Sequence, residues 1–115
     1  MSEHRSARQV VFQLLRLQSR RDGDTHSVSA EGELDLSSSP ALERELSVAR
    51  ESDAEQIVLD LTGLTFVDCA GLRVILCMDA RSSDRPGRFK VRPAPEKVHR
   101  IFSLTSAARQ LSFLR

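Results

Sequence analysis

A compact apolar run at residues 57–61, IVLDL, sets the centre of any fold that this chain adopts. Only one acid interrupts the run, and polar residues flank it on both sides. Such a segment is typical of a central strand that is covered on both faces, as in parallel or mixed sheets with helices packed on them. The rest of the sequence is therefore expected to supply neighbouring strands and covering helices.

The N-terminal part of the chain predicts a hairpin followed by a helix. VFQLLRLQS, from residue 11, predicts one strand, an Asp-Gly turn in residues 20–24 closes the hairpin, and THSVSAEG is the return strand. The following helix has N-cap hydroxyls in residues 37–39 and Pro40 in its first turn, where acids are also expected. Its apolar stripe consists of Leu42, Leu46 and Ala49.

The C-terminal part predicts two more helices, each followed by a strand. TGLTF is expected to be a loop with Gly63 as its hinge. A second helix starts near Asp68, its expected N-cap, and ends before Pro86 and Gly87. This helix is apolar over more than one face, and Cys77 is expected to lie in the core. RFKVRP then predicts a strand, APEKVHRIFSL a third helix and RQLSFL a last strand.

These segments give the order strand, strand, helix, strand, helix, strand, helix, strand. Short loops join the strand–helix units, so right-handed crossovers over a partly parallel sheet are expected. The predicted fold class is α/β, a single domain with a mixed sheet and helices packed on it, because 115 residues suit one core. We expect residues 1–10 to form a flexible arm and residues 11–115 to form the domain.

The composition argues against several classes of function. Net charge is +1 and Trp and Tyr are absent, so the chain offers nucleic acid neither a strong field nor a stacking platform. No apolar run reaches the ~20 residues of a membrane helix, and no cleavage pattern marks secretion. His4, His26 and His99 do not pair with the cysteines at zinc spacing. No metal, cofactor, nucleic-acid partner or direct membrane insertion is therefore expected.

The two cysteines are expected to be free thiols. Cys69 and Cys77 lie eight positions apart in the second predicted helix. The helical rise separates their Cα atoms by about 12 Å, which is too far for a disulfide. Free thiols and the lack of an export signal favour a cytoplasmic location.

Residues 66–76, FVDCAGLRVIL, leave three interpretations of Cys69 open: a reactive thiol, a small residue at a crowded helix start, or a substitute for another residue. A nucleophile requires a base, and nothing in the sequence places His99 beside Cys69. A catalytic pair of Asp35 and Asp60 is a further hypothesis, but carboxylates at strand ends more often cap loops.

Three segments together resemble the STAS domain of anti-sigma factor antagonists: GELDLSSSPALEREL, IVLDLTGLTFVDCAGLRVIL and RPAPEKVHRIFSLTS. The joint signature is GELD before the first helix, an apolar strand ending in LDL, and F-x-D-x-x-G-L at the second helix. The likeness runs from residue 12 onward with the same order of elements. It implies a STAS-like fold and a binding module, not an enzyme.

The resemblance also implies a partner and a switch. The partner is an anti-sigma factor with a histidine-kinase-like ATP-binding fold, which the unmodified antagonist sequesters, so that a sigma factor is freed for transcription. The kinase phosphorylates a serine directly after the motif aspartate, and here Cys69 holds that position, with Ala70 following. A thiol is not a usual kinase substrate. The chain is therefore expected to be locked in its binding-competent form or governed by thiol chemistry.

The docking surface that the resemblance implies is the start of the second helix with the loops around it. Its expected residues are Asp35, Leu36, Ser37, Thr65, Asp68, Cys69, Ala70, Gly71 and Leu72, with Arg73 and Arg81 as rim contacts. Two alternatives stay open. One is a thiol-based redox switch centred on Cys69, and the other is a STAS subunit of a transporter or stress-sensing assembly.

Overall fold

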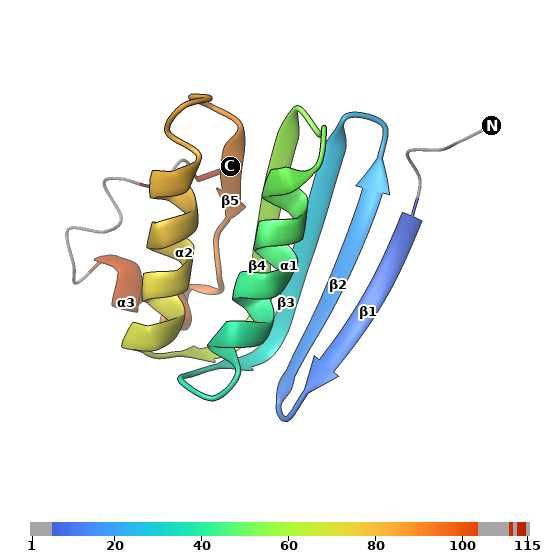
Figure 1. The fold of residues 1–115 in the computed structure, drawn as a ribbon. Coiled ribbons are helices and arrows are strands. Elements are labelled where there is room, and N and C mark those ends of the chain that lie inside the picture. The colour runs from blue at the N-terminus through green and yellow to red at the C-terminus, as the bar shows by residue number, and fades with distance from the viewer. Residues whose placement is uncertain (1–5, 104–110, 112, 115) are drawn as a thin grey trace.

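The structure, a computed structural model, describes residues 6–103, 111, 113 and 114, in which a five-stranded sheet and three helices are present (Figure 1). The strands are β1 (Ser6–Phe12), β2 (Leu15–Asp22), β3 (Thr25–Leu34), β4 (Gln56–Val67) and β5 (Phe89–Arg92). The helices are α1 (Ser39–Glu51), α2 (Cys69–Arg81) and α3 (Glu96–Ser103).

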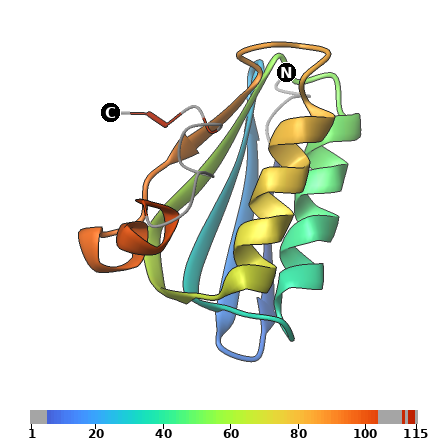
Figure 2. The same ribbon diagram turned by 90° about the vertical axis from the view of Figure 1, so that its left-hand side faces the viewer.

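The sheet is mixed, which confirms the predicted fold class. Its strand order is β1-β2-β3-β4-β5. The first three strands pair antiparallel, and β3, β4 and β5 pair parallel. Helices α1 and α2 form the two crossovers and lie side by side against one face of the sheet (Figure 1). Helix α3 lies on the other side of β4 and β5 from these two helices (Figure 2).

Helices lie on both sides of the central strand β4, as predicted, but they cover its two faces unevenly (Figure 2). Its residues facing α1 and α2 are fully buried: Ile57, Leu59 and Leu61. On the alternate positions Val58 and Asp60 are only half-buried. Successive right-handed crossovers in one direction place their helices on the same face, which explains the asymmetry. The other face carries a polar row in register across all five strands: Gln9, Gln18, Ser29, Asp60 and Arg92.

The N-terminal segment forms two strands where one was predicted. Residues 6–10 of the expected arm belong to β1, which pairs with β2 from Ser6↔Arg21 to Phe12↔Leu15. The reversal falls at Gln13 and Leu14, which carry no Gly, Pro, Asn or Asp turn signal. Gln13 adopts the left-handed conformation with φ 55°. Glutamine is not a typical turn residue, so the sequence did not predict the β1–β2 hairpin.

Gly32 on β3 allows this unexpected turn to pack against the sheet. A Cβ at Gly32 would overlap the carbonyl oxygen of Leu14, and the glycine has φ 99°. The same Leu14 oxygen accepts a hydrogen bond from the N–H of Glu33 at 2.9 Å. The tip of the β1–β2 hairpin is therefore fastened to β3.

Two predicted boundaries in the C-terminal part also change. Gly63, expected in a loop, lies within β4, which continues to Val67 with register shifts against β3. The last predicted strand falls largely outside the described residues. Its described part includes Phe113, which forms a parallel bridge with Val91, and Leu111, which is buried.

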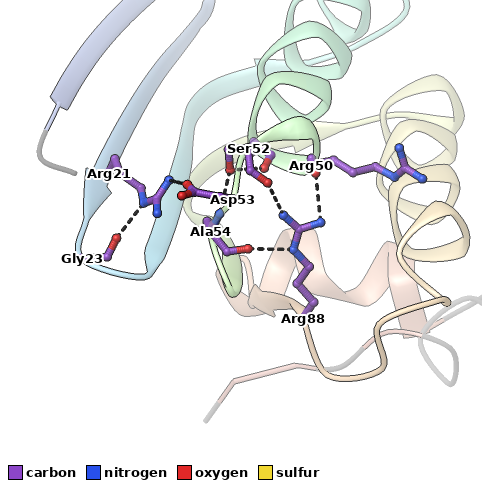
Figure 3. A network of polar contacts seen from close by, with 8 residues as sticks. Arg21, Gly23, Arg50, Ser52, Asp53, Ala54 and Arg88 are labelled. Carbon is purple, nitrogen blue, oxygen red and sulfur yellow. Dashed lines mark hydrogen bonds and ion pairs between the residues drawn. The ribbon is translucent and has the colours of Figure 1, made fainter. Parts of the chain in front are cut away.

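Arg88 closes the C-terminal end of α1 from a distant part of the chain (Figure 3). Its guanidinium donates hydrogen bonds to the carbonyl oxygens of Arg50, Ser52 and Ala54, each at 2.9 Å. Helix C-termini leave carbonyl groups without intrahelical partners, and the fork of an arginine can satisfy several at once. Arg88 is buried, so water does not compete freely for these bonds.

Replacing Arg88 with lysine is expected to destabilise the fold. A lysine ammonium cannot reach all three carbonyls, and unsatisfied buried acceptors cost about 1–3 kcal/mol each. We expect Arg88→Lys to lower the free energy of unfolding by about 2 kcal/mol or more in urea titrations. The exposed neighbour Arg85 is the matched control, and Arg85→Lys should change stability by less than about 0.5 kcal/mol. Equal effects of the two substitutions would contradict the capping role.

His26 is a buried titratable group beneath α1. Neither ring nitrogen has a hydrogen-bond partner among the described residues. Burial lowers the pKa of the imidazole, the charge of Arg21 lowers it further, and Glu45 acts in the opposite direction. The protonated form is therefore disfavoured in the folded state.

Stability is expected to fall on mild acidification because of His26. The unfolded chain, with an imidazole pKa of about 6.5, binds the proton more readily than the folded protein. The contribution is thus fully present above pH about 6.5 and is lost as the pH falls through the lower folded-state pKa. Urea titrations between pH about 7.5 and about 5.5 should show this loss in the wild type. His26→Gln should remove it, and an unchanged slope in that variant would exclude His26 as the source.

Candidate functional site

The side chain of Asp68 joins the start of α2 to the β3–α1 loop. One carboxylate oxygen accepts a hydrogen bond from the N–H of Gly71 at 3.0 Å, which confirms the predicted N-cap. The other accepts from the N–H of Leu36 at 3.0 Å. The Asp68 N–H in turn donates to the carbonyl of Leu34 at 3.2 Å. Asp68 therefore positions two neighbouring loops relative to each other.

Asp35 organises the loop that Asp68 holds. One carboxylate oxygen accepts from the N–H of Ser37 at 3.0 Å and of Ser38 at 3.1 Å. The hydroxyls of Ser37 and Ser38 also donate to it. These bonds, with the Ser37 hydroxyl first, lower the pKa of Asp35, so the carboxylate is charged near neutral pH.

The start of α1 differs from the prediction in its chemistry. Ser38 occupies the N-cap position, but its side chain makes no capping hydrogen bond to the helix. No acidic residue lies in the first turn, since Glu43 comes one turn later. The serine hydroxyls bond to Asp35 instead, and Ser37 shares its single hydroxyl hydrogen between Asp35 and the side-chain oxygen of Gln13, which is 2.8 Å away.

Cys69 is exposed at the first position of α2, beside a groove between α1 and α2. The groove has a volume of about 440 Å³. Its lining consists of Leu36, Ser39, Glu43, Cys69, Ala70, Arg73, Val74 and Cys77. Small and apolar side chains from α2 contribute much of this lining. The arrangement presents the Cys69 thiol to solvent at one end of a surface that another molecule can contact.

Cys77 lies in this groove and not in the core, contrary to the prediction. The α2 residues that face the sheet are Gly71, Leu72, Ile75 and Met78, all buried. Cys77 falls between Ile75 and Met78 in sequence but on the outward side of the helix, and it is exposed. Because α2 is apolar on more than one face, hydropathy alone did not identify its inner side.

Two of the predicted docking residues cannot touch a partner directly. Gly71 and Leu72 are buried. A Cβ at Gly71 would lie 2.6 Å from Cγ of Leu34, so this glycine seats α2 close to β3. Leu72 belongs to the hydrophobic core. Both residues therefore act by placing the first turn of α2.

The other predicted docking residues around Cys69 lie on the β3–α1 loop and near the end of β4. Leu36 and Ser37 are exposed and Asp35 is half-buried. Thr65 is exposed on β4, and its hydroxyl donates to the carbonyl of Gly32 at 3.1 Å. The prediction omitted Phe66, an exposed aromatic residue two positions before Asp68. Its exposure had no sequence signal, because the adjacent apolar residue Val67 is buried.

The hypothesis that Asp35 and Asp60 form a catalytic pair finds no support in their contacts. Asp60 lies on the face of the sheet opposite α1 and α2, accepts hydrogen bonds from Thr62 and is 3.6 Å from Arg92. The Asp35 carboxylate accepts hydrogen bonds from Ser37 and Ser38 instead.

Within the described residues no group of His, Cys, Asp and Glu side chains is arranged to hold a metal ion. No helix in the described part has the length and apolar character needed to cross a membrane.

The family of the chain follows from sequence comparison. A family model described as Mlab, STAS domain, matches residues 17–114. The chain belongs to the STAS domain family. Among curated proteins none matches it by sequence.

Solved structures show the same fold in this STAS domain and in several proteins. An anti-sigma factor antagonist from Mycobacterium paratuberculosis superimposes with a TM-score of 0.75 and 20% identity, over 94% of this chain and 85% of that one. The phosphorylated form of the Bacillus cell fate determinant SpoIIAA superimposes with a TM-score of 0.60 and 14% identity, over 96% of this chain and 92% of that one. The murine anion transporter Slc26a9 superimposes with a TM-score of 0.65 and 14% identity, over 81% of this chain and 16% of that one.

The double role of Asp68 leads to a prediction for the STAS domain. Asparagine offers one acceptor oxygen, so Asp68→Asn can satisfy Gly71 or Leu36 but not both. We expect a loss of about 1–2 kcal/mol in the free energy of unfolding. Faster amide exchange at whichever of Leu36 or Gly71 loses its acceptor should accompany this loss. Asp24→Asn, at an exposed turn, is the control and should change neither the free energy of unfolding nor the exchange of the Leu36 and Gly71 amides. Unchanged exchange at both amides in Asp68→Asn would contradict the bridging role.

Proposed function

We propose that this STAS domain is a regulatory binding module that sequesters a kinase-type anti-sigma factor and thereby promotes sigma-dependent transcription. The observation that carries the proposal is the exposed Cys69 on the first turn of α2, where the resembling antagonists carry a phosphorylated serine. The module acts by occupying its partner and not by catalysis. Its expected place of action is the cytoplasm, where sigma factors work.

The expected docking surface is the first turn of α2 with the loops that Asp68 joins to it. Cys69, Leu36 and Ser37 are exposed there, and Asp35 adds a charged carboxylate. A phosphate on the residue after Asp68 would bring a charge of about −1.5 to −2 to a surface that already carries the carboxylates of Asp35 and Asp68. Such charge would be costly to bury against a partner, which gives the phosphoserine switch its physical basis.

Cys69 alters that switch. Its side chain is close in size to serine and carries no phosphate, so the surface retains its binding-competent shape and charge. A kinase partner that turns off serine-bearing antagonists would fail to release this one. The proposed consequence is an antagonist that stays engaged until its amount or its thiol state changes.

Thiol control of Cys69 is a second candidate, favoured by the exposure of this side chain. Oxidation or alkylation would add bulk or charge at the docking surface, as phosphate does on serine. Selective modification of Cys69 over Cys77, which is also exposed, would favour this candidate. Equal, slow modification of both thiols would count against it.

A third candidate is a STAS subunit of a larger assembly such as a transporter. The similarity to Slc26a9 concerns the fold alone, and the STAS domain corresponds to 16% of that protein. Under this candidate the same exposed surface would contact a transporter subunit. Co-purification with such a subunit, and not with a kinase-type protein, would decide for it.

The switch position can be tested by restoring its serine. Purified wild type, Cys69→Ser and Cys77→Ser would be incubated with each kinase-type anti-sigma factor of the source organism and labelled ATP. We expect phosphate transfer to Cys69→Ser and none to the wild type, because only the hydroxyl is a kinase substrate. Cys77→Ser, two turns along the same helix, is the control and should stay unlabelled.

Binding completes the test of the proposal. Cys69→Glu places a carboxylate at the switch position and should weaken binding of the anti-sigma factor at least tenfold, whereas Cys77→Glu should weaken it less. No binding of any kinase-type anti-sigma factor by the wild type would refute the proposed function.

A further inference from the structure

Exposed large apolar side chains gather at one end of the sheet. Six are exposed in the described part of the chain, and five of them lie where β1 turns into β2, β3 leads to α1 and β4 leads to α2: Val11, Phe12, Leu14, Leu36 and Phe66. This is the lower end of the sheet in Figure 1. The sixth, Val48, lies on α1. Clustering of this kind marks an interaction surface, because scattered single residues are the norm.

The β1–β2 tip, residues 11–14, is continuous with the loops around Cys69. Ser37 donates a hydrogen bond to the side chain of Gln13, and Leu36 is held by Asp68. Leu36 also lines the groove that contains Cys69. A second hollow, of about 350 Å³, lies beside the tip and is lined in part by Val11 and Leu14. Apolar surface thus extends from the start of α2 across Leu36 to the hairpin.

The tip is held in place before any partner arrives. Leu14 accepts a hydrogen bond from Glu33 at 2.9 Å, and the missing Cβ of Gly32 lets the turn approach β3. Preorganisation reduces the entropy lost on binding, so the exposed leucine can contribute fully to affinity. Leu14 is 68% exposed in spite of these restraints.

The charges around the tip indicate the chemistry of the partner. Glu31, Glu33, Asp35 and Asp68 lie at this end of β3 and α2. Arg16, in a 3.8 Å ion pair with Glu31, offsets one of these charges, and Arg73 in the groove wall adds one positive charge, whereas Glu43 adds another negative one. The surface is therefore apolar with an acidic surround. It complements a protein surface that is apolar at its centre and basic at its rim.

We infer that the β1–β2 tip forms the second half of the docking surface and inserts Leu14 into the same partner that contacts the Cys69 end of α2. The inference rests on the proposed function only in that this partner is expected to be the kinase-type anti-sigma factor. The hairpin extends the contact beyond the switch residue, so part of the affinity is independent of the chemistry at Cys69.

Photo-crosslinking in the source cells tests this surface. A photoreactive phenylalanine analogue would replace Leu14, Arg73 in the groove wall, or Val48 as the control, one at a time in the full chain. We expect Leu14 and Arg73 to crosslink to the same protein and Val48 to give no such adduct. With that protein purified, Leu14→Asp should weaken binding at least tenfold, whereas Val48→Asp, at a 52% exposed site, should stay within twofold.

The outcomes separate this inference from the proposed function. A shared adduct that is not a kinase-type anti-sigma factor keeps the two-part surface and refutes the proposed partner. An adduct from Arg73 alone overturns the inference and leaves the proposed function standing. Crosslinking of Leu14 to a second copy of the chain, or no adduct from Leu14, also overturns the inference. So does Leu14→Asp binding as tightly as the wild type while retaining wild-type thermal stability.

Discussion

The carboxylate of Asp68 is the interaction on which the arrangement of the functional end depends. It satisfies the free N–H of Gly71 at the start of α2 and the N–H of Leu36 in the loop before α1. Because one rigid group serves both, the two helices begin at a fixed separation, and the groove between them has a defined mouth. Gly71 supports the same geometry, since it allows α2 to lie against Leu34. The exposed Cys69 therefore lies on a helix start whose position is fixed by hydrogen bonds and close packing, and not on a free loop.

The two ends of the sheet differ in construction. At the upper end in Figure 1, polar bonds join loops to strands. Arg88 bonds to three carbonyls at and just after the C-terminal end of α1, and Arg21 pairs with Asp53 at 2.8 Å beside the β2–β3 turn (Figure 3). At the lower end Asp68 bonds to the backbone N–H groups of Leu36 and Gly71, but Leu14, Leu36 and Phe66 remain exposed. One end closes the domain, and the other leaves apolar surface available for association.

Local patterns in the sequence were sufficient for much of this structure. The mixed α/β fold class and the Asp68 cap depend on neighbouring residues, and both were confirmed, although β1 adds a strand to the predicted order. The turn at Gln13 was missed because the glycine that permits it, Gly32, stands on another strand. Arg88 looked like one of several basic residues in a predicted strand, because its acceptors are backbone carbonyls that a sequence does not display. Cys77 was misplaced because a helix with apolar residues on several sides does not reveal which side meets the sheet.

The placement of Arg88 has a consequence for how the chain is made. The guanidinium that completes α1 lies 34 to 38 residues after the carbonyls it binds. During synthesis α1 therefore leaves the ribosome with its last turn unfinished, and it stays so until the residues before β5 follow. Nascent chains that end before this point contain Cys69 and both long helices, yet lack the group that closes the first one. Such chains should be prone to capture by chaperones until Arg88 has left the ribosome.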